Sequence, residues 1–150
     1  MRIEKDYKEF IALLNEHSVL YLVVGAYAVS YYARPRNTGD IDFFVNNSKE
    51  NIKRLLTVLA EFGFGELDLS QKDFRGDDKI LQLGYEPIRI DIMTGISGIS
   101  FQEAYRNRKS SKLGGHRVNF ISLDDLILNK RASKRTKDLA DVELLEQFRN

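Results

Sequence analysis

Two aspartates placed two residues apart in an apolar run are the feature that most restricts the fold of this chain. The run Asp40-Ile41-Asp42-Phe43-Phe44-Val45 is typical of a β-strand because apolar, β-branched and aromatic residues dominate it. Since successive side chains of a strand point to opposite faces, Asp40 and Asp42 share one face. Two carboxylates side by side on such a strand repel each other unless a cation neutralises them. The alternative is a solvent-exposed strand end, where water stabilises both charges.

A third aspartate lies in a second apolar segment, Arg89-Ile90-Asp91-Ile92-Met93. Three carboxylates on neighbouring strands can hold two metal ions, an arrangement that serves phosphoryl and nucleotidyl transfer. Hard divalent cations prefer oxygen ligands, which favours Mg²⁺. Asp91 also has a simpler explanation, because Arg89 on the same strand is able to neutralise it in an ion pair.

A glycine precedes the first aspartate pair at a position suited to phosphate. Gly25 closes the apolar run Leu20–Val24 and opens a short predicted helix. Backbone N–H groups at the start of a helix favour a bound phosphate, although glycine also closes strands for steric reasons alone. Arg36 and Thr38 follow, so that these residues and the Asp40–Asp42 pair fall within eighteen positions.

Composition excludes several classes of protein and site. The 150 residues are 43% hydrophobic and 30% charged, which is typical of one ordinary globular domain. The chain has no cysteine and two histidines, so a metal ion is expected on oxygen ligands. No run approaches the roughly 18 apolar residues of a membrane span, and the N-terminus is not apolar. We therefore expect a cytoplasmic protein with no membrane partner.

Positive charge is concentrated in one part of the chain. The net charge is only +1, yet residues 105–137 hold ten Lys or Arg residues against two acidic residues. Such a stretch is either an ordinary solvated surface or a surface that faces a polyanion. The sequence leaves both explanations open.

Hydrophobic periodicity predicts helices that alternate with short strands. Helices are expected over about 4–16, 26–33, 49–62 and 101–109, and over a C-terminal pair that meets near Thr136. Strands are expected over 20–24, 40–45, 80–83, 88–93 and 118–121, whereas residues 65–78 receive no assignment. The pattern predicts an α/β or α+β chain with a mixed sheet. We expect one domain over 1–150, with a core over about 18–122 and C-terminal helices over about 123–149.

These motifs occur together in a known superfamily. Val24-Gly25-Ala26-Tyr27-Ala28-Val29, followed by Arg36-Asn37-Thr38-Gly39-Asp40-Ile41-Asp42, resembles the signature of the DNA polymerase β-like nucleotidyltransferase superfamily. The segments 89–101, 126–130 and 135–141 are similar to a minimal bacterial and archaeal branch of it. Some members of that branch are toxins of abortive-infection toxin–antitoxin pairs. The resemblance covers about residues 20–145.

The resemblance implies a nucleotidyltransferase-like mixed β-sheet flanked by helices, and metal-dependent transfer of a nucleotidyl group from an NTP to a hydroxyl or phosphate acceptor with release of pyrophosphate. tRNA and a partner protein are the acceptor candidates. Mg²⁺ or Mn²⁺ is the expected cofactor, with two ions beside a bound NTP. The alternative is a catalytically weak or inactive, antitoxin-like binding partner that keeps the fold. Neither reading fixes the oligomeric state.

The resemblance also assigns roles to residues. It makes Asp40 and Asp42 ligands of the triphosphate metal, and Asp91 a ligand of the catalytic metal or the base. The expected nucleotide-binding residues are Gly25, Ala26, Arg36, Thr38, Lys130 and Lys137. Ala26 departs from the Gly or Ser usual in the superfamily and therefore lacks a hydroxyl for phosphate.

Lys130 has a second explanation that needs no nucleotide. Steps of three and four residues lead from Lys130 to Lys134, Asp138 and Asp141. If the helix is continuous, these residues form an exposed face of alternating charge, which stabilises a helix modestly. Lys134 is expected to face solvent.

Overall fold

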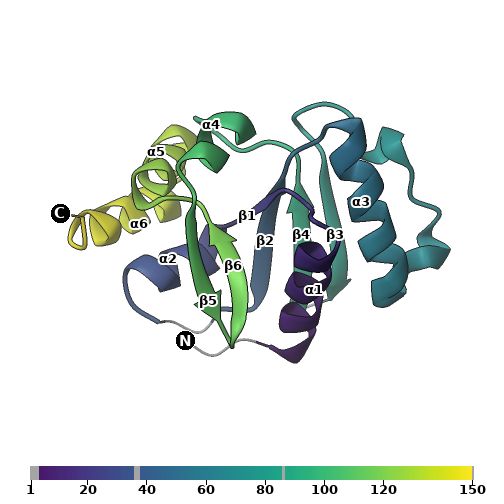
Figure 1. The fold of residues 1–150 in the computed structure, drawn as a ribbon. Coiled ribbons are helices and arrows are strands. Elements are labelled where there is room, and N and C mark those ends of the chain that lie inside the picture. The colour runs from purple at the N-terminus through teal and green to yellow at the C-terminus, as the bar shows by residue number, and fades with distance from the viewer. Residues whose placement is uncertain (1–3, 36–37, 86, 150) are drawn as a thin grey trace.

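The computed structural model describes residues 4–35, 38–85 and 87–149, and these form a six-stranded mixed sheet with helices packed around it (Figure 1). The strand order is β3-β4-β2-β1-β6-β5. The strands are β1 (Tyr21–Val24), β2 (Asp40–Val45), β3 (Ile80–Tyr85), β4 (Ile88–Met93), β5 (Lys109–Leu113) and β6 (His116–Phe120). The α-helices are α1 (Lys5–Glu16), α2 (Gly25–Tyr32), α3 (Lys49–Leu59), α4 (Phe101–Arg106), α5 (Leu123–Ser133) and α6 (Thr136–Glu146). The predicted mixed α+β architecture is confirmed.

The central strands are held by one core that includes the first helix. All four residues of β1 are buried, and α1 contributes four fully buried side chains, Tyr7, Phe10, Ile11 and Leu14. The ring of Phe10 contacts that of Phe43, with the centroids 5.3 Å apart. The face of β2 that carries Phe43 is therefore covered by α1, and the opposite face carries Asp40 and Asp42. In Figure 1, α2, α5 and α6 lie together, away from α1 and α3.

Helix starts agree with the sequence signals. The hydroxyls of Ser48, Ser100 and Ser122 accept hydrogen bonds from backbone N–H groups three residues ahead, as N-cap residues do. The predicted helix over 49–62 is regular only as far as Leu59. A π-helical turn over Ala60–Phe64 follows, and Gly63 within it has φ +110°. The 3₁₀ turns Gly65–Leu67 and Gln71–Phe74 occupy much of the unassigned segment 65–78.

The predicted helix over 101–109 is wrong in its last residues. α4 ends at Arg106, and Lys109–Leu113 form β5, which pairs antiparallel with β6 across the Gly114-Gly115 turn. The sequence Lys-Ser-Ser-Lys-Leu has no apolar alternation that would predict a strand. Because β5 is an edge strand and mostly exposed, it does not need that alternation.

The C-terminal helices meet where the sequence predicted. α5 ends at Ser133, Lys134 follows with φ +60°, and α6 starts at Thr136. Among the described residues, no helix combines the length and the apolar character needed to cross a membrane.

Candidate active site

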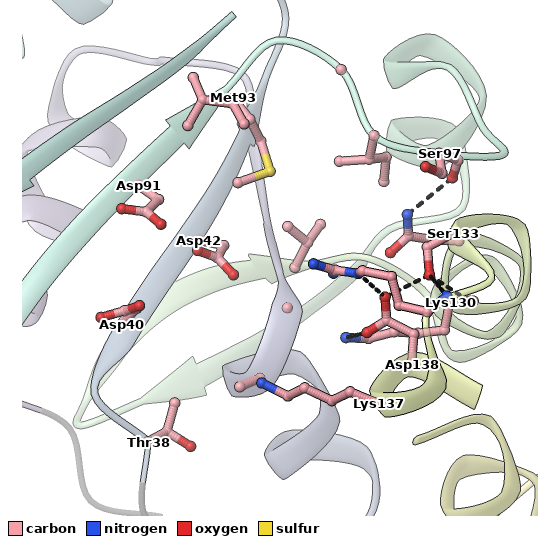
Figure 2. Close-up of a pocket in the computed structure, with 18 of the residues that line it drawn as sticks. Thr38, Asp40, Asp42, Asp91, Met93, Ser97, Lys130, Ser133, Lys137 and Asp138 are labelled. Carbon is pink, nitrogen blue, oxygen red and sulfur yellow. Dashed lines mark hydrogen bonds and ion pairs between the residues drawn. The ribbon is translucent and has the colours of Figure 1, made fainter. Parts of the chain in front are cut away.

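The register of β2 and β4 brings the three aspartates together. The two strands pair in parallel, with Asp40 opposite Arg89 and Asp42 opposite Asp91. Because residues two apart in a strand share a face, all four side chains lie on the same side of the sheet. They line a pocket of about 880 Å³. Figure 2 shows Asp40, Asp42 and Asp91 side by side on one wall of that pocket.

Arg89 is the immediate counter-ion of this group. Its Nη2 lies 2.7 Å from Oδ2 of Asp40. Its Nε lies 2.9 Å from Oδ1 of Asp91, and Nη2 donates to Oδ2 of Asp91 at 3.1 Å. The ion pair that the sequence offered as a simpler explanation of Asp91 is therefore present, and it extends to Asp40. One guanidinium serves two of the three carboxylates.

The arrangement disfavours the charged form of the Asp42 carboxylate. Burial raises the pKa of Asp42 to about 6, and the negative charges of Asp91 and Asp40 add to the effect. Lys130 and Arg89 oppose this shift in pKa without cancelling it. Within the described parts of the chain, the Asp42 carboxylate makes no ion pair. The pocket wall therefore has more negative charge than its own cations neutralise.

The donor set fits a hard divalent cation, although no group of three acidic or histidine side chains in the described ranges is already arranged as a metal site. Oδ1 of Asp40 is buried and has no hydrogen-bond partner among the described residues. A buried carboxylate oxygen without a partner is costly, and a cation removes that cost. Oδ1 of Asp40 and the carboxylate of Asp42 together provide the oxygen ligands that Mg²⁺ or Mn²⁺ prefers.

Gly25 is required by its contact with Asp42. A Cβ atom at position 25 would lie 2.0 Å from Oδ2 of Asp42, and Gly25 has φ +67°. Both the close approach and the left-handed backbone exclude a larger residue. Gly25 and Ala26 line the pocket at the first turn of α2.

Tyr7 ties the starts of the two aspartate-bearing strands together, a role that its place on the apolar side of a helix did not reveal. Its hydroxyl donates to the carbonyl of Gly39 and accepts from the backbone N–H of Arg89 at 3.0 Å. Burial raises the pKa of Tyr7 to about 12, so the hydroxyl keeps its proton. α1 thereby fixes the backbone on either side of the Asp40–Arg89 pair.

Lys130 lies at the edge of the pocket in a buried ion cluster. Its Nζ is 3.1 Å from Oδ1 of Asp138 and 3.4 Å from Oδ2 of Asp141. The prediction of an exposed helical face of alternating charge is wrong, because the chain turns at Lys134 and buries Asp138 and Asp141. Lys134 is exposed, as predicted. The positive charge of Lys130 is thus largely neutralised by side chains of α6.

Asp138 is the centre of that cluster, and the sequence had given it no such role. It is 1% exposed and accepts hydrogen bonds from Ser133, Arg135 and Lys130. Burial alone would raise the pKa of Asp138, but these three donors outweigh it and lower the pKa to about 2. The carboxylate therefore joins the end of α5 to the start of α6, and Figure 2 shows its bonds at the pocket wall.

The predicted nucleotide-binding residues line the same pocket, with one position untested. The pocket wall includes Gly25, Ala26, Thr38, Lys130 and Lys137. Arg36 lies outside the described residues. Lys137 is exposed and makes no ion pair with any described side chain, so its charge is available. Three pocket residues that the sequence did not single out, Ile80, Met93 and Ile96, supply an apolar part.

Three solved structures have a fold similar to that of this chain. The crystal structure of the lincosamide antibiotic adenylyltransferase LnuA, lincomycin-bound, is 13% identical, with TM-score 0.60 and 98% of each chain covered. A putative nucleotidyltransferase from Thermotoga maritima is 15% identical, with TM-score 0.62, over 97% of this chain and 94% of that one. ANT(2")-Ia in complex with adenylyl-2"-tobramycin is 13% identical, with TM-score 0.58, over 93% and 84%.

At these identities the structural likenesses establish the fold, and a search of curated proteins gives no match. The family is established by a model that covers almost the whole chain. The model described as "Nucleotidyl transferase of unknown function (DUF2204)" matches residues 3–149. The superfamily resemblance of the sequence motifs is confirmed, and the chain belongs to this nucleotidyltransferase family.

Proposed function

We propose that this nucleotidyltransferase transfers a nucleotidyl group from an NTP to a hydroxyl or phosphate acceptor, in a divalent-metal-dependent reaction that releases pyrophosphate. The observation that carries the proposal is the position of Asp40, Asp42 and Asp91 on one wall of a pocket that also receives Lys137 (Figure 2). Carboxylates on one side and a cation on the other are what a metal-bound triphosphate requires.

Asp40, Asp42 and Asp91 are the proposed ligands of Mg²⁺ or Mn²⁺, with two ions beside a bound NTP. Bound cations neutralise triphosphate charge and activate the reacting oxygens. The side chain of Arg89 holds the carboxylates of Asp40 and Asp91, and Tyr7 holds the backbone of Arg89 and Gly39. This arrangement is consistent with catalysis by positioning, which in-line phosphoryl transfer mainly needs.

The triphosphate is proposed to lie between the first turn of α2 and the start of α6. The backbone at Gly25 and Ala26 offers N–H donors there. Lys137 supplies an available ammonium, whereas Nζ of Lys130 is held by Asp138 and Asp141. We therefore assign the direct phosphate contact to Lys137. Lys130 acts through its charge, which limits the rise in the pKa of Asp42. Arg36 and Thr38 remain predicted phosphate contacts.

The reaction forms a bond from the acceptor oxygen to the α-phosphorus while the bond from that phosphorus to its bridging oxygen breaks. Pyrophosphate leaves with the electron pair of the broken bond. A hydroxyl acceptor gives its proton to a base, for which Asp91 is the candidate if it does not act only as a metal ligand. The pocket residues thus orient the two reactants, and the side chains form no covalent bond with them.

The acceptor is proposed from three classes. tRNA and a partner protein follow from the sequence resemblance. The fold is shared with adenylyltransferases whose titles name a lincosamide antibiotic and adenylyl-2"-tobramycin, which adds small hydroxyl-bearing molecules. Ile80, Met93 and Ile96 give the pocket an apolar part that suits such a molecule.

The second candidate is a binding partner of a toxin–antitoxin pair that keeps the fold with little activity. Two observations favour it: the Arg89–Asp91 ion pair, and the exposure of Ile80 and Tyr85, which are 64% and 90% exposed. Exposed apolar side chains of this kind mark protein contacts. The pocket around the carboxylates favours the enzyme, because a pure binding protein has no need of it.

The test is a transfer assay with each NTP labelled at the α-phosphate, with Mg²⁺, Mn²⁺ or EDTA, and with tRNA, protein and small hydroxyl acceptors. We expect label transfer and pyrophosphate release that need the metal. Asp42→Asn should abolish both, whereas Asp68→Asn, an exposed aspartate with φ +54°, should not. Nucleotide binding without transfer to any acceptor would favour the binding partner.

A further inference from the structure

A second basic surface lies away from the active site, on the end of α4 and on the β5–β6 hairpin. We call it the hairpin basic surface, and it comprises Arg106, Arg108, Lys112 and Arg117, all exposed. No described acidic side chain makes an ion pair with any of them, and residues 104–123 include no Asp or Glu. The basic stretch of the sequence is therefore divided between the pocket and this separate surface.

The hairpin places two of these cations in an unfavourable pair. Lys112 on β5 lies directly opposite Arg117 on β6, and like charges in that position destabilise a sheet. Lysines on an edge strand prevent sheet-to-sheet aggregation, which explains Lys109 and Lys112. Arg117 has no such explanation, because it lies on β6, which is not an edge strand: β6 pairs with β5 along its length and with β1 at Phe120. A local arrangement that costs stability is typical of a site that binds something.

A small polar cavity opens in this surface. Its volume is about 180 Å³, and its wall includes Arg108, Arg117, Asn15, Ser110 and Asn119. The cavity shares no lining residue with the active-site pocket. It is too small for a drug-sized molecule, but it offers guanidinium donors to one phosphate group and amide and hydroxyl groups to a neighbouring sugar hydroxyl.

Arg108 presents a flat cationic face beside the cavity. Its guanidinium carbon lies 4.0 Å from the centre of the Tyr105 ring, and that ring stacks on Phe101 with centroids 5.2 Å apart. The other face of an exposed guanidinium stacked in this way is a platform for an unpaired base. A duplex does not offer such a base, whereas a single strand does.

The surface lacks the apolar centre of a protein interface. The exposed large hydrophobic residues of the described chain all lie outside residues 101–122. Protein partners usually need such residues at the middle of the contact, while a phosphate backbone needs cations and polar groups. We propose that the hairpin basic surface binds single-stranded RNA, with phosphates at Arg108, Lys112 and Arg117 and a base stacked on Arg108.

The experiment measures fluorescence anisotropy of a labelled, unstructured single-stranded RNA with the full-length protein over a series of KCl concentrations. The double variant Lys112→Gln/Arg117→Gln should weaken binding and lower the slope of log Kd against log[KCl] by about 1.4, which is two phosphate contacts at about 0.7 each. The control Lys53→Gln/Arg54→Gln removes the same charge from exposed positions of α3 and should leave the slope unchanged.

Three further arms separate RNA from other polyanions. A DNA of the same sequence, a duplex RNA and polyglutamate should each bind more weakly than the single-stranded RNA. Equal affinity for any of these, or equal loss in the two double variants, would overturn the proposal. Thermal unfolding checks that the variants fold, and NTP binding should be unchanged in both. Failure of RNA binding with intact NTP binding rejects this inference and leaves the proposed enzyme function standing.

Discussion

Asp40 and Arg89 are register partners on parallel strands, and Nη2 of Arg89 lies 2.7 Å from Oδ2 of Asp40. The same guanidinium binds Asp91, two residues further along its own strand. The side chain of Arg89 therefore pairs with two of the three carboxylates on this wall of the pocket. Tyr7 holds the backbone of Arg89 and of Gly39, the residue before Asp40, so the geometry of the pair is supported from the opposite face of the sheet.

Replacing Arg89 should leave the repulsion between the three carboxylates uncompensated. Arg89→Met is expected to lower the free energy of unfolding at pH 7 by on the order of 2–4 kcal/mol, because it leaves partly buried carboxylates without a partner. Addition of Mg²⁺ should restore more stability to the variant than to the wild type. Urea denaturation with and without Mg²⁺ measures both effects.

The matched control is Arg131→Met, which breaks an exposed pair with Glu146. Such pairs contribute at most about 1 kcal/mol, and Mg²⁺ should make no difference there. If Arg89→Met and Arg131→Met lose the same stability, Arg89 does not organise the wall as described.

Asp42 should make the protein less stable as the pH rises through its titration. Its pKa is raised from 3.8 to about 6 in the folded state, so the folded protein binds this proton more tightly than the unfolded chain. Stability from this group is complete below about pH 4 and is lost as the pH rises to about 6. Asp42→Asn should therefore gain stability relative to wild type across this window, approaching about 2–3 kcal/mol at pH 7.

Urea denaturation from pH 4 to pH 7 without divalent ions measures the difference. Asp68→Asn, at an exposed aspartate, should give a difference that does not vary with pH. A constant difference for Asp42→Asn as well would mean that burial and the neighbouring carboxylates do not raise the pKa of Asp42.

Asp138 should have the opposite pH dependence. Its folded-state pKa is lowered from 3.8 to about 2, so its contribution is complete above about pH 4 and is lost as the pH falls toward 2. Asp138→Asn should cost about 3–5 kcal/mol at pH 7, because Lys130 then loses its closest partner in a buried cluster. Thermal or urea unfolding at pH 7 and at pH 3 tests this, with a smaller loss expected at pH 3.

Asp124→Asn is the control, since Asp124 pairs with Arg149 in solvent. Its loss at pH 7 should be small. A loss for Asp138→Asn no larger than that for Asp124→Asn would show that the cluster does not hold α5 to α6.

Gly25 should tolerate a side chain less well while Asp42 is present than in its absence. Gly25→Ala places a Cβ against Oδ2 of Asp42, so it should displace that carboxylate and also strain the backbone at φ +67°. In an Asp42→Gly background only the backbone cost remains. A double-mutant cycle by urea denaturation should therefore give a coupling energy of about 1–2 kcal/mol. Additive effects would contradict the contact.

The sequence predicted the carboxylate wall because strand periodicity determines it. Asp40, Asp42 and Asp91 share a face whenever β2 and β4 are neighbours in this register, and the motifs indicated that they are. The strand β5 was missed for a physical reason. Its residues are polar because an edge strand in solvent buries little, so no hydrophobic period distinguishes Lys109–Leu113 from the end of a helix.

The role of α6 was missed because it depends on one backbone angle. With Lys134 in the left-handed region, α6 turns back, and Asp138 and Asp141 become buried partners of Lys130. A continuous helix would have left them exposed. Nothing in local propensity at Lys134 predicts that angle, since lysine rarely adopts it. The contacts of Tyr7 were equally hidden, because they join residues 32 and 82 positions apart in the sequence.

The most direct test of the central claim, that Asp40, Asp42 and Asp91 form a metal–nucleotide site, is isothermal titration of the protein with NTP in the presence of Mg²⁺ and in EDTA. We expect saturable binding to the wild type and to Asp68→Asn that requires Mg²⁺, and no such binding to Asp42→Asn although that variant is folded and at least as stable. Unchanged Mg²⁺-dependent affinity in Asp42→Asn, or wild-type affinity that is the same in EDTA, would show that these aspartates do not form such a site.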